Sequence, residues 1–255
     1  MKRAIVLVGV YFLMQLVSSI LCVAALTGMD FVRHQTFNID VMSLSTAAIV
    51  PSLILGFVLM AAFLWRKGYL KDARLWNITT FAFLGWSILL GMSLIFLIDI
   101  LMSLLNVPDF LETSFDVIES GWIGILAVAI IGPVLEEMLF RGAITKELLK
   151  QYEPSKAIFI SGLIFGIFHL NPAQIFPAML IGFVLAWLYW RTGSLIPGIL
   201  IHIVNNSLSC YLSITYPNTN DITELLGAGI VAGVLLAVAL GYFSFKQLTK
   251  AELLP

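Results

Sequence analysis

A few ionisable side chains of this chain lie inside stretches that are otherwise apolar. Glu136 and Glu137 are adjacent in the run 123–140, and two of the three histidines, His169 and His202, also lie in apolar runs. A charged side chain near the centre of a bilayer costs about 3 kcal/mol or more, so each one needs a partner or a function. A carboxylate and two imidazoles can activate a water molecule and stabilise an oxyanion. These residue types therefore predict hydrolysis.

The two adjacent glutamates are predicted to have different roles. On a helix, Glu137 and Arg141 are four residues apart and share a face, whereas Glu136 points about 100° away from Glu137. We interpret Glu137 and Arg141 as a structural ion pair near the end of their helix. A second acid beside one that is already paired adds like-charge cost, which favours a role in proton transfer. Glu136 is therefore the candidate for that chemistry.

Two further motifs supply the histidines. Phe165 lies four residues before His169, so the ring and the imidazole share a helix face. His202 and Asn206 share a face in the same way, while Asn205 is turned away by about 100°. We interpret Asn205 as the donor or acceptor of an interhelical hydrogen bond worth roughly 1 kcal/mol. The carboxylate, the two imidazoles and the amide of Asn206 thus come from three separate predicted helices.

The same residues allow other chemistries. Glu136, His169 and His202 match the ligand types of a catalytic zinc site, so zinc is a candidate cofactor beside a metal-independent mechanism, and spacing does not decide between them. Buried acids and histidines also mark proton relays, which makes a proton-coupled transporter an alternative. The sequence shows no internal repeat of the kind found in many transporters. It also contains no serine or cysteine nucleophile motif and no HExxH.

The composition determines the kind of element that positions these groups. Hydrophobic residues make up 60% of the 255 residues and charged residues 11%, with a mean hydropathy of +1.00. The formal net charge of -1 argues against a nucleic-acid partner, which would require a basic face. Cys22 and Cys210 lie in apolar runs, so we predict no disulfide between them. The fold class that we predict is an all-α, polytopic transmembrane helical bundle.

Breaks between the apolar runs define about eight predicted spans, because a helix needs about 20 apolar residues to cross the hydrocarbon core. The predicted segments are 4–26, 43–65, 77–105, 120–149, 155–170, 174–190, 195–215 and 222–246. The fifth and sixth segments are short and are joined by a tight turn at 169–172, so we expect them to be antiparallel neighbours. The run 106–119 is predicted to be an exterior loop.

The basic residues set the predicted orientation, because Lys and Arg are retained on the cytoplasmic side of a membrane. In the eight-span arrangement every Lys and Arg except Arg33 falls on one side, and the run 106–119 on the other side contains no basic residue. Both termini are therefore predicted to be cytoplasmic. Asp99, late in the third segment, is expected near the exterior surface and away from Glu136. The small size and short loops favour a prokaryotic plasma membrane.

The three motifs resemble those of the CPBP family, the membrane-embedded CAAX proteases and bacteriocin-processing enzymes that are also called Abi proteins. The family motifs EExxxR, FxxxH and HxxxN are present as Glu136–Arg141, Phe165–His169 and His202–Asn206. We therefore divide the single bundle into N-terminal transmembrane helices, a CPBP/Abi catalytic core and a C-terminal helix with a short tail. These three parts are residues 1–119, 120–215 and 216–255.

The resemblance implies a glutamate-dependent intramembrane endopeptidase of the CAAX prenyl protease type, surrounded by membrane lipid, with a peptide or prenylated peptide as substrate. Glu136 would be the general base, and His169 would bind and polarise the water. His202 and Asn206 would stabilise the oxyanion. The supporting residues would be Glu137, Arg141 and Phe165. Family members also act in bacteriocin maturation or self-immunity, so a non-catalytic bacteriocin-immunity protein is a further alternative, and the oligomeric state is left open.

Overall fold

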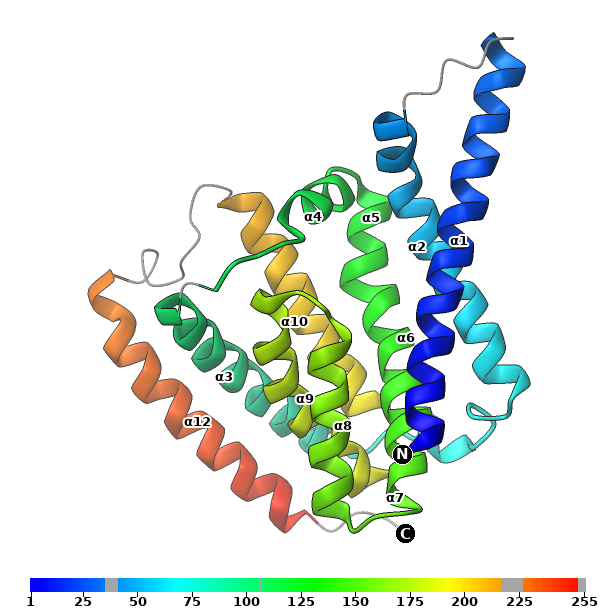
Figure 1. The fold of residues 1–255 in the computed structure, drawn as a ribbon. Coiled ribbons are helices and arrows are strands. Elements are labelled where there is room, and N and C mark those ends of the chain that lie inside the picture. Colours follow the sequence, from blue (N-terminus) through cyan, green and yellow to red (C-terminus); the bar gives the residue numbers. More distant parts are fainter. Residues whose placement is uncertain (35–40, 106, 217–226, 252–255) are drawn as a thin grey trace.

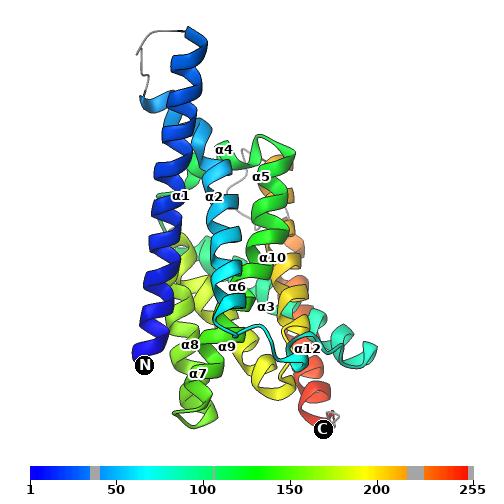
Figure 2. The same cartoon turned by 90° about the vertical axis from the view of Figure 1, so that its right-hand side faces the viewer.

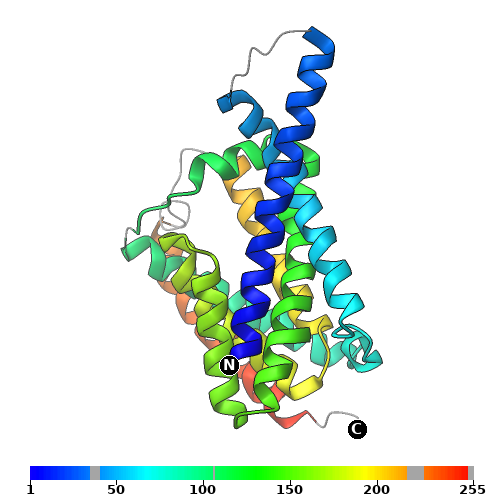
Figure 3. The ribbon, with the colours of Figure 1, turned by 45° about the vertical axis from the view of Figure 1, so that its right-hand side comes forward.

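The computed structural model describes residues 1–34, 41–105, 107–216 and 227–251, which are helical and contain no strand. Long helices run side by side, with α1 paired to α2, α3 to α12 and α8 to α9 (Figures 1, 2 and 3). The elements are α1 (Lys2–His34), α2 (Val41–Arg66), η1 (Ala73–Trp76), α3 (Phe81–Leu105), α4 (Glu112–Glu119), α5 (Trp122–Leu126), η2 (Ala127–Ile131), α6 (Gly132–Leu139), η3 (Phe140–Thr145), α7 (Lys146–Leu149), α8 (Pro154–Phe168), α9 (Pro172–Thr192), α10 (Ile196–Thr215), η4 (Gly227–Gly229) and α12 (Ile230–Lys250).

The predicted helical membrane bundle is confirmed. Each of the eight predicted segments corresponds to a helical stretch, and six helices in the described ranges are long and apolar enough to cross a membrane. The two others are α8, which is too short at 15 residues, and α10, whose apolar run is interrupted by His202 and two asparagines. The protein is therefore an integral, multi-pass membrane protein.

Some boundaries differ from the prediction. The helix α1 continues to His34, beyond the predicted end at residue 26, and projects past the other helices at that end (Figures 1 and 2). The run 106–119 was predicted to be a loop, but it contains the helix α4, which begins with Glu112 in its first turn and buries Ile118. The predicted start of the last span, residue 222, lies outside the described residues.

The stretch that carries the two adjacent glutamates, Glu136 and Glu137, lies at the centre of the bundle. Half of the most apolar window of Trp122–Leu149 is buried, a larger share than in any of the other five candidate spans. Its side chains Leu135, Leu139, Phe140 and Ile144 belong to the main hydrophobic core. Polar groups on this stretch are therefore shielded from lipid by neighbouring helices.

Ion pairs fasten one end of this central stretch. Arg3 on α1 lies 2.8 Å from Glu147, which also accepts a hydrogen bond from Lys150. Lys146 lies 2.9 Å from Asp72, in the connection between α2 and η1. The beginning of α1 and the end of α12 lie at this same end of the bundle (Figure 1). The end of the central helix is thereby tied to two other parts of the chain.

Candidate active site

Two π-helical segments, η2 and η3, flank the short α-helix α6 that carries Glu136 and Glu137. In a π-helix each N–H reaches the carbonyl five residues back, and such segments occur frequently at functional sites. The N–H of Gly132 donates to the carbonyl of Ala127, and Pro133 has no N–H. The carbonyl of Val128 therefore lacks the donors four and five residues ahead of it in its own helix.

Glu136 and both motif histidines point toward one another from three helices. Oε2 of Glu136 on α6 lies 3.7 Å from Nε2 of His202 on α10 and 4.0 Å from Nε2 of His169 at the end of α8. That oxygen is buried and has no hydrogen-bond partner within the part of the chain that the structure describes. The side chains of Glu136 and His169 remain 16% and 19% exposed. Glu136 is thus mostly buried in the bundle but remains partly accessible.

Glu137 is fully buried behind this group. Its Oε1 lies 2.6 Å from Nη1 of Arg141 and 3.2 Å from Nδ1 of His202. Because a carboxylate only accepts hydrogen bonds, Nδ1–H of His202 donates to Glu137, which turns Nε2 toward Glu136. A Cβ atom at Gly198 would lie only 2.6 Å from Oε2 of Glu137. The absence of a side chain at Gly198 is what lets α10 approach so closely.

Arg141 is also fully buried and connects three helices. Besides its ion pair with Glu137, its Nη2 donates to the carbonyl of Gly182 on α9 at 3.0 Å. Its guanidinium lies 4.4 Å from the centroid of the Phe165 ring on α8, which is the geometry of a cation–π contact. Hydrogen bonding and aromatic stacking together are characteristic of arginine rather than lysine.

His169 lies immediately after α8 and is oriented by the first residue of its motif. Its Nδ1 lies 2.8 Å from the carbonyl oxygen of Phe165. A carbonyl only accepts, so Nδ1–H is the donor and Nε2 remains available toward Glu136. The Phe165 ring packs edge-on against both imidazoles, with centroid distances of 5.0 Å to His169 and 5.7 Å to His202. Phe165 thus contacts the site through its backbone and its ring.

Asn206 joins α10 to the π-helical segment η2. Its Nδ2 donates to the carbonyl of Val128 at 2.9 Å, and its Oδ1 accepts from Nδ2 of Asn205 at 3.0 Å. Asn205 was expected to make an interhelical hydrogen bond, but in this structure its amide bonds the neighbouring amide on the same helix. An amide nitrogen carries two hydrogens, so Asn206 keeps one for a further acceptor.

Two other ionisable residues, Asp99 and His34, take no part in these contacts. Asp99 is half-buried on α3. His34 is the last residue of α1, and its Nε2 lies 3.5 Å from Oδ1 of Asp30 one turn earlier. Neither residue belongs to the group that Glu136, Glu137, His169 and His202 form.

Glu136, His169 and His202 do not form a metal site as they are placed. Within the described ranges, no group of three or more His, Cys, Asp or Glu side chains is arranged to hold a metal ion. Two ligands of one tetrahedral zinc lie about 3.3 Å apart when each is about 2.0 to 2.1 Å from the ion. The separations of 3.7 and 4.0 Å are longer than that. A zinc ion held by all three residues would therefore require these side chains to move closer together.

Several supporting groups were not predicted from the sequence. The carbonyls of Val128 and Gly182 belong to the backbone and leave no residue-type signal, although Pro133 marks the place where a helix loses a donor. Gly198 lies four residues before His202, on the same helix face, so its small size could have indicated a close helix contact.

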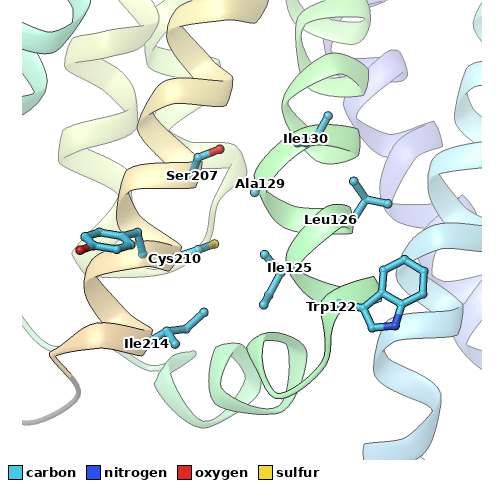
Figure 4. Close-up of a pocket in the computed structure, with 9 residues that line it drawn as sticks. Trp122, Ile125, Leu126, Ala129, Ile130, Ser207, Cys210 and Ile214 are labelled. Carbon is cyan, nitrogen blue, oxygen red and sulfur yellow. The ribbon is translucent and has the colours of Figure 1, made fainter.

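An apolar cavity of about 550 Å³ lies beside the site, between α5–η2 and α10 (Figure 4). Ala129 and Ser207, which line it, directly follow the two residues of the Val128–Asn206 hydrogen bond. The other lining residues are Trp122, Ile125, Leu126, Ile130, Cys210, Tyr211 and Ile214. Nearly all of the lining is apolar, so the cavity is suited to an apolar group that approaches the site.

Comparison with known proteins agrees with the motif resemblance. Residues 118–208 match the family model described as type II CAAX prenyl endopeptidase Rce1-like. The match covers about a third of the chain, and we call residues 118–208 the Rce1-like segment. The Rce1-like segment contains Glu136, His169, His202 and Asn206.

One curated relative is similar over part of its length. It is the protein of Bacillus subtilis (strain 168) named "Putative membrane peptidase YdiL", which is 35% identical over 96 residues. The similar stretch is 38% of this chain and 39% of that relative. No solved structure matches the chain.

Proposed function

We propose that this protein is a membrane peptidase that hydrolyses a peptide bond with a water molecule activated by Glu136. The observation that carries the proposal is the approach of Glu136 Oε2 to Nε2 of His169 and of His202, at 4.0 and 3.7 Å, within the Rce1-like segment. A buried carboxylate oxygen that faces two imidazoles can hold a water molecule and accept its proton. Residues 120–215 act as the catalytic core in this proposal, and the remaining helices act as its scaffold.

In the first step of the proposed reaction, Glu136 removes a proton from the water while His169 orients it. The resulting hydroxide attacks the carbonyl carbon of the scissile peptide bond, and the carbonyl electrons move onto its oxygen. In the second step the oxyanion re-forms the carbonyl, the C–N bond breaks, and Glu136 returns the proton to the leaving nitrogen. The products are a carboxylic acid and an amine, which then exchange a proton to become a carboxylate and an ammonium group, and no other reactant is needed.

The oxyanion of the intermediate is stabilised by donors from α10. The proposed donors are the second amide hydrogen of Asn206 and Nε2–H of His202 in its imidazolium form, in which Nδ1–H still bonds Glu137. Preorganised donors of this kind can contribute several kcal/mol in a water-poor site. Glu137 holds the His202 imidazole in this orientation by accepting a hydrogen bond from Nδ1–H, at 3.2 Å. Arg141 holds Glu137 through their ion pair, and the Phe165 ring packs against both imidazoles.

We further propose a substrate that combines a peptide with an apolar group, such as a prenylated or strongly hydrophobic peptide. The support is the apolar cavity beside Asn206 and the position of the site in a membrane-spanning stretch. In the proposed orientation both termini are cytoplasmic, and Glu136 is reached from the cytoplasm or from the inner leaflet. A tag at either terminus that is accessible from outside intact cells would contradict this orientation.

The proposed activity is tested directly with detergent-purified protein and a panel of matched prenylated and unprenylated peptides, with products identified by mass spectrometry. Cleavage at one defined bond supports the peptidase. Preference for the prenylated member of each pair supports the substrate class. If the folded protein cleaves no peptide, and Glu136→Ala protects cells from a bacteriocin as well as wild type does, the non-catalytic immunity function is correct instead.

A further inference from the structure

The turn between α8 and α9 begins at His169. The chain leaves the helix after Phe168, and Leu170 has a φ of 54°, a left-handed conformation that is unfavourable for a residue with a bulky side chain. Pro172 restricts the residue before it, and Asn171 is extended, with φ -111° and ψ 118°. A backbone conformation of this kind persists only where its surroundings hold it.

Asn171 makes the contacts that hold this turn. It is completely buried and stands at the N-cap of α9, where an asparagine side chain usually bonds its own helix, yet it makes no cap bond. Its Nδ2 instead donates to Oδ1 of Asp109 at 2.9 Å, and its Oδ1 accepts from the N–H of Phe110 at 3.1 Å. The nitrogen and the oxygen of the Asn171 amide thus both form hydrogen bonds with the segment 107–111, which precedes α4.

The partner segment is arranged for this contact. Oδ1 of Asp109 also accepts from the N–H of Leu111 at 2.8 Å, which fixes the carboxylate above the turn. The segment passes over the turn between α8 and α9 (Figure 1). Asp109 is exposed and Phe110 is 69% exposed, so the segment is attached to the turn by the two hydrogen bonds of Asn171 more than by burial of its own side chains.

We propose that Asn171 is a positioning residue for His169 and that Asp109 is its partner, an inference that rests on the hydrolytic role proposed for His169. Only Leu170 separates the two residues. With Asn171 held by Asp109 and Phe110, Leu170 is kept in its left-handed conformation and Nε2 of His169 stays directed toward Glu136. A segment far from the motifs in sequence thereby controls the geometry of the water-binding pair.

An exchange of the two side chains tests the pair. Asn171→Asp removes the amide donor and places two carboxylates together, and Asp109→Ala removes the acceptor, which the amide oxygen of an asparagine would keep. A displacement of about 1 Å can cost up to a hundredfold in rate, so each single variant should lower kcat by about tenfold or more with little change in KM. The double variant Asn171→Asp/Asp109→Asn restores one donor facing one acceptor and should recover most of kcat. Asp116→Asn, an exposed acid on α4, is the control that should cleave normally.

A second readout does not depend on cleavage. The chain has three histidines, so side-chain ¹⁵N spectra of histidine-labelled protein contain few signals. The His169 signals should shift in both single variants and return in the double variant, while those of His34 stay constant. If Asn171→Asp does not fold, Asp109→Ala decides alone, because Asp109 is exposed.

The outcomes separate this inference from the proposed function. Normal kcat and unchanged His169 signals in both single variants overturn the positioning role, even if Glu136→Gln is inactive. Loss of kcat that the double variant does not restore overturns Asp109 as the partner. If wild type cleaves nothing, the proposed function fails, and the His169 signals alone decide whether Asn171 positions that side chain.

Discussion

Nδ1 of His202 lies 3.2 Å from Oε1 of Glu137, and the same oxygen lies 2.6 Å from Nη1 of Arg141. One glutamate of the adjacent pair is thus committed to orienting an imidazole and binding a buried guanidinium. Its neighbour, Glu136, faces the opposite nitrogen of the same imidazole, at 3.7 Å. The turn of about 100° between successive helical residues separates the two carboxylates into these different environments.

Substitution of Gly198 tests the importance of the buried glutamate. In Gly198→Ala the added Cβ would lie 2.6 Å from Oε2 of Glu137, so the carboxylate or α10 must move. We expect kcat/KM to fall by about tenfold or more and stability to fall by roughly 1 to 3 kcal/mol. The matched control is Gly85→Ala on α3, where a Cβ meets nothing within 4 Å. Equal activities of the two variants in a peptide-cleavage assay would reject the role given to Glu137.

Removal of the Asn206 amide tests the oxyanion site. In Asn206→Ala we expect kcat to fall by about 10² to 10³ with KM nearly unchanged, because the donor acts mainly in the transition state. The carbonyl of Val128 also loses its side-chain donor, so a stability loss of roughly 1 to 3 kcal/mol should accompany it. Asn205→Ala removes only the contact to Oδ1 of Asn206 and should have a smaller effect. A larger effect on KM than on kcat in Asn206→Ala would assign the amide to substrate binding.

Stability at acid pH depends on Asp72, outside the membrane spans. Hydrogen bonds from Lys146 and Arg74 hold the pKa of the Asp72 carboxyl well below its usual range. Because the folded-state pKa lies below the unfolded value of about 3.9, the stabilisation is present above that pH and is lost as the pH falls toward the folded pKa. Asp72→Asn should destabilise the protein at pH 7 by roughly 0.5 to 1 kcal/mol.

The Asp72 prediction is checked by melting curves across pH. The Tm difference between wild type and Asp72→Asn should be largest near neutral pH and should shrink as the pH falls below about 4. A Tm difference that stays constant from pH 7 to pH 3 would show that the hydrogen bonds of Asp72 do not stabilise the fold through its charge.

Chelation tests the metal-independent form of the mechanism. The separations of Glu136 from His169 and His202 exceed those expected of ligands of one zinc, so peptide cleavage should continue unchanged in the presence of a chelator. The matching measurement is the metal content of the purified protein by mass spectrometry before and after chelation. If the protein contains stoichiometric zinc, loses activity when the zinc is removed and regains activity when zinc is added back, the metal-independent mechanism is wrong.

Much of the bundle could be predicted from the sequence because long apolar runs and helical spacing are local signals. The four-residue spacing predicted the Glu137–Arg141 contact, which is present at 2.6 Å, and the shared face of Phe165 and His169. The turn after α8 was predicted from Pro172 and the shortness of the neighbouring runs. Each of these features follows from residues that are close together in the chain.

The features that escaped prediction depend on contacts between distant parts of the chain. The π-helical segments shift the register of the central helix, and the amide that bonds the freed carbonyl of Val128 comes from Asn206, 78 residues later. The Asn171–Asp109 contact joins residues 62 apart. The helix α4 was read as a loop because its eight residues are too few and too polar to resemble a span.

The most direct test of the central claim is a comparison of Glu136→Gln with wild type in peptide cleavage by purified protein. The substitution keeps the shape of the side chain and removes the base, so cleavage should fall by at least about 10² to 10⁴ while the melting temperature stays close to that of wild type. Glu112→Gln, an exposed acid on α4, is the matched control and should cleave normally. Folded Glu136→Gln protein that retains the wild-type rate would contradict the assignment of Glu136 as the water-activating base.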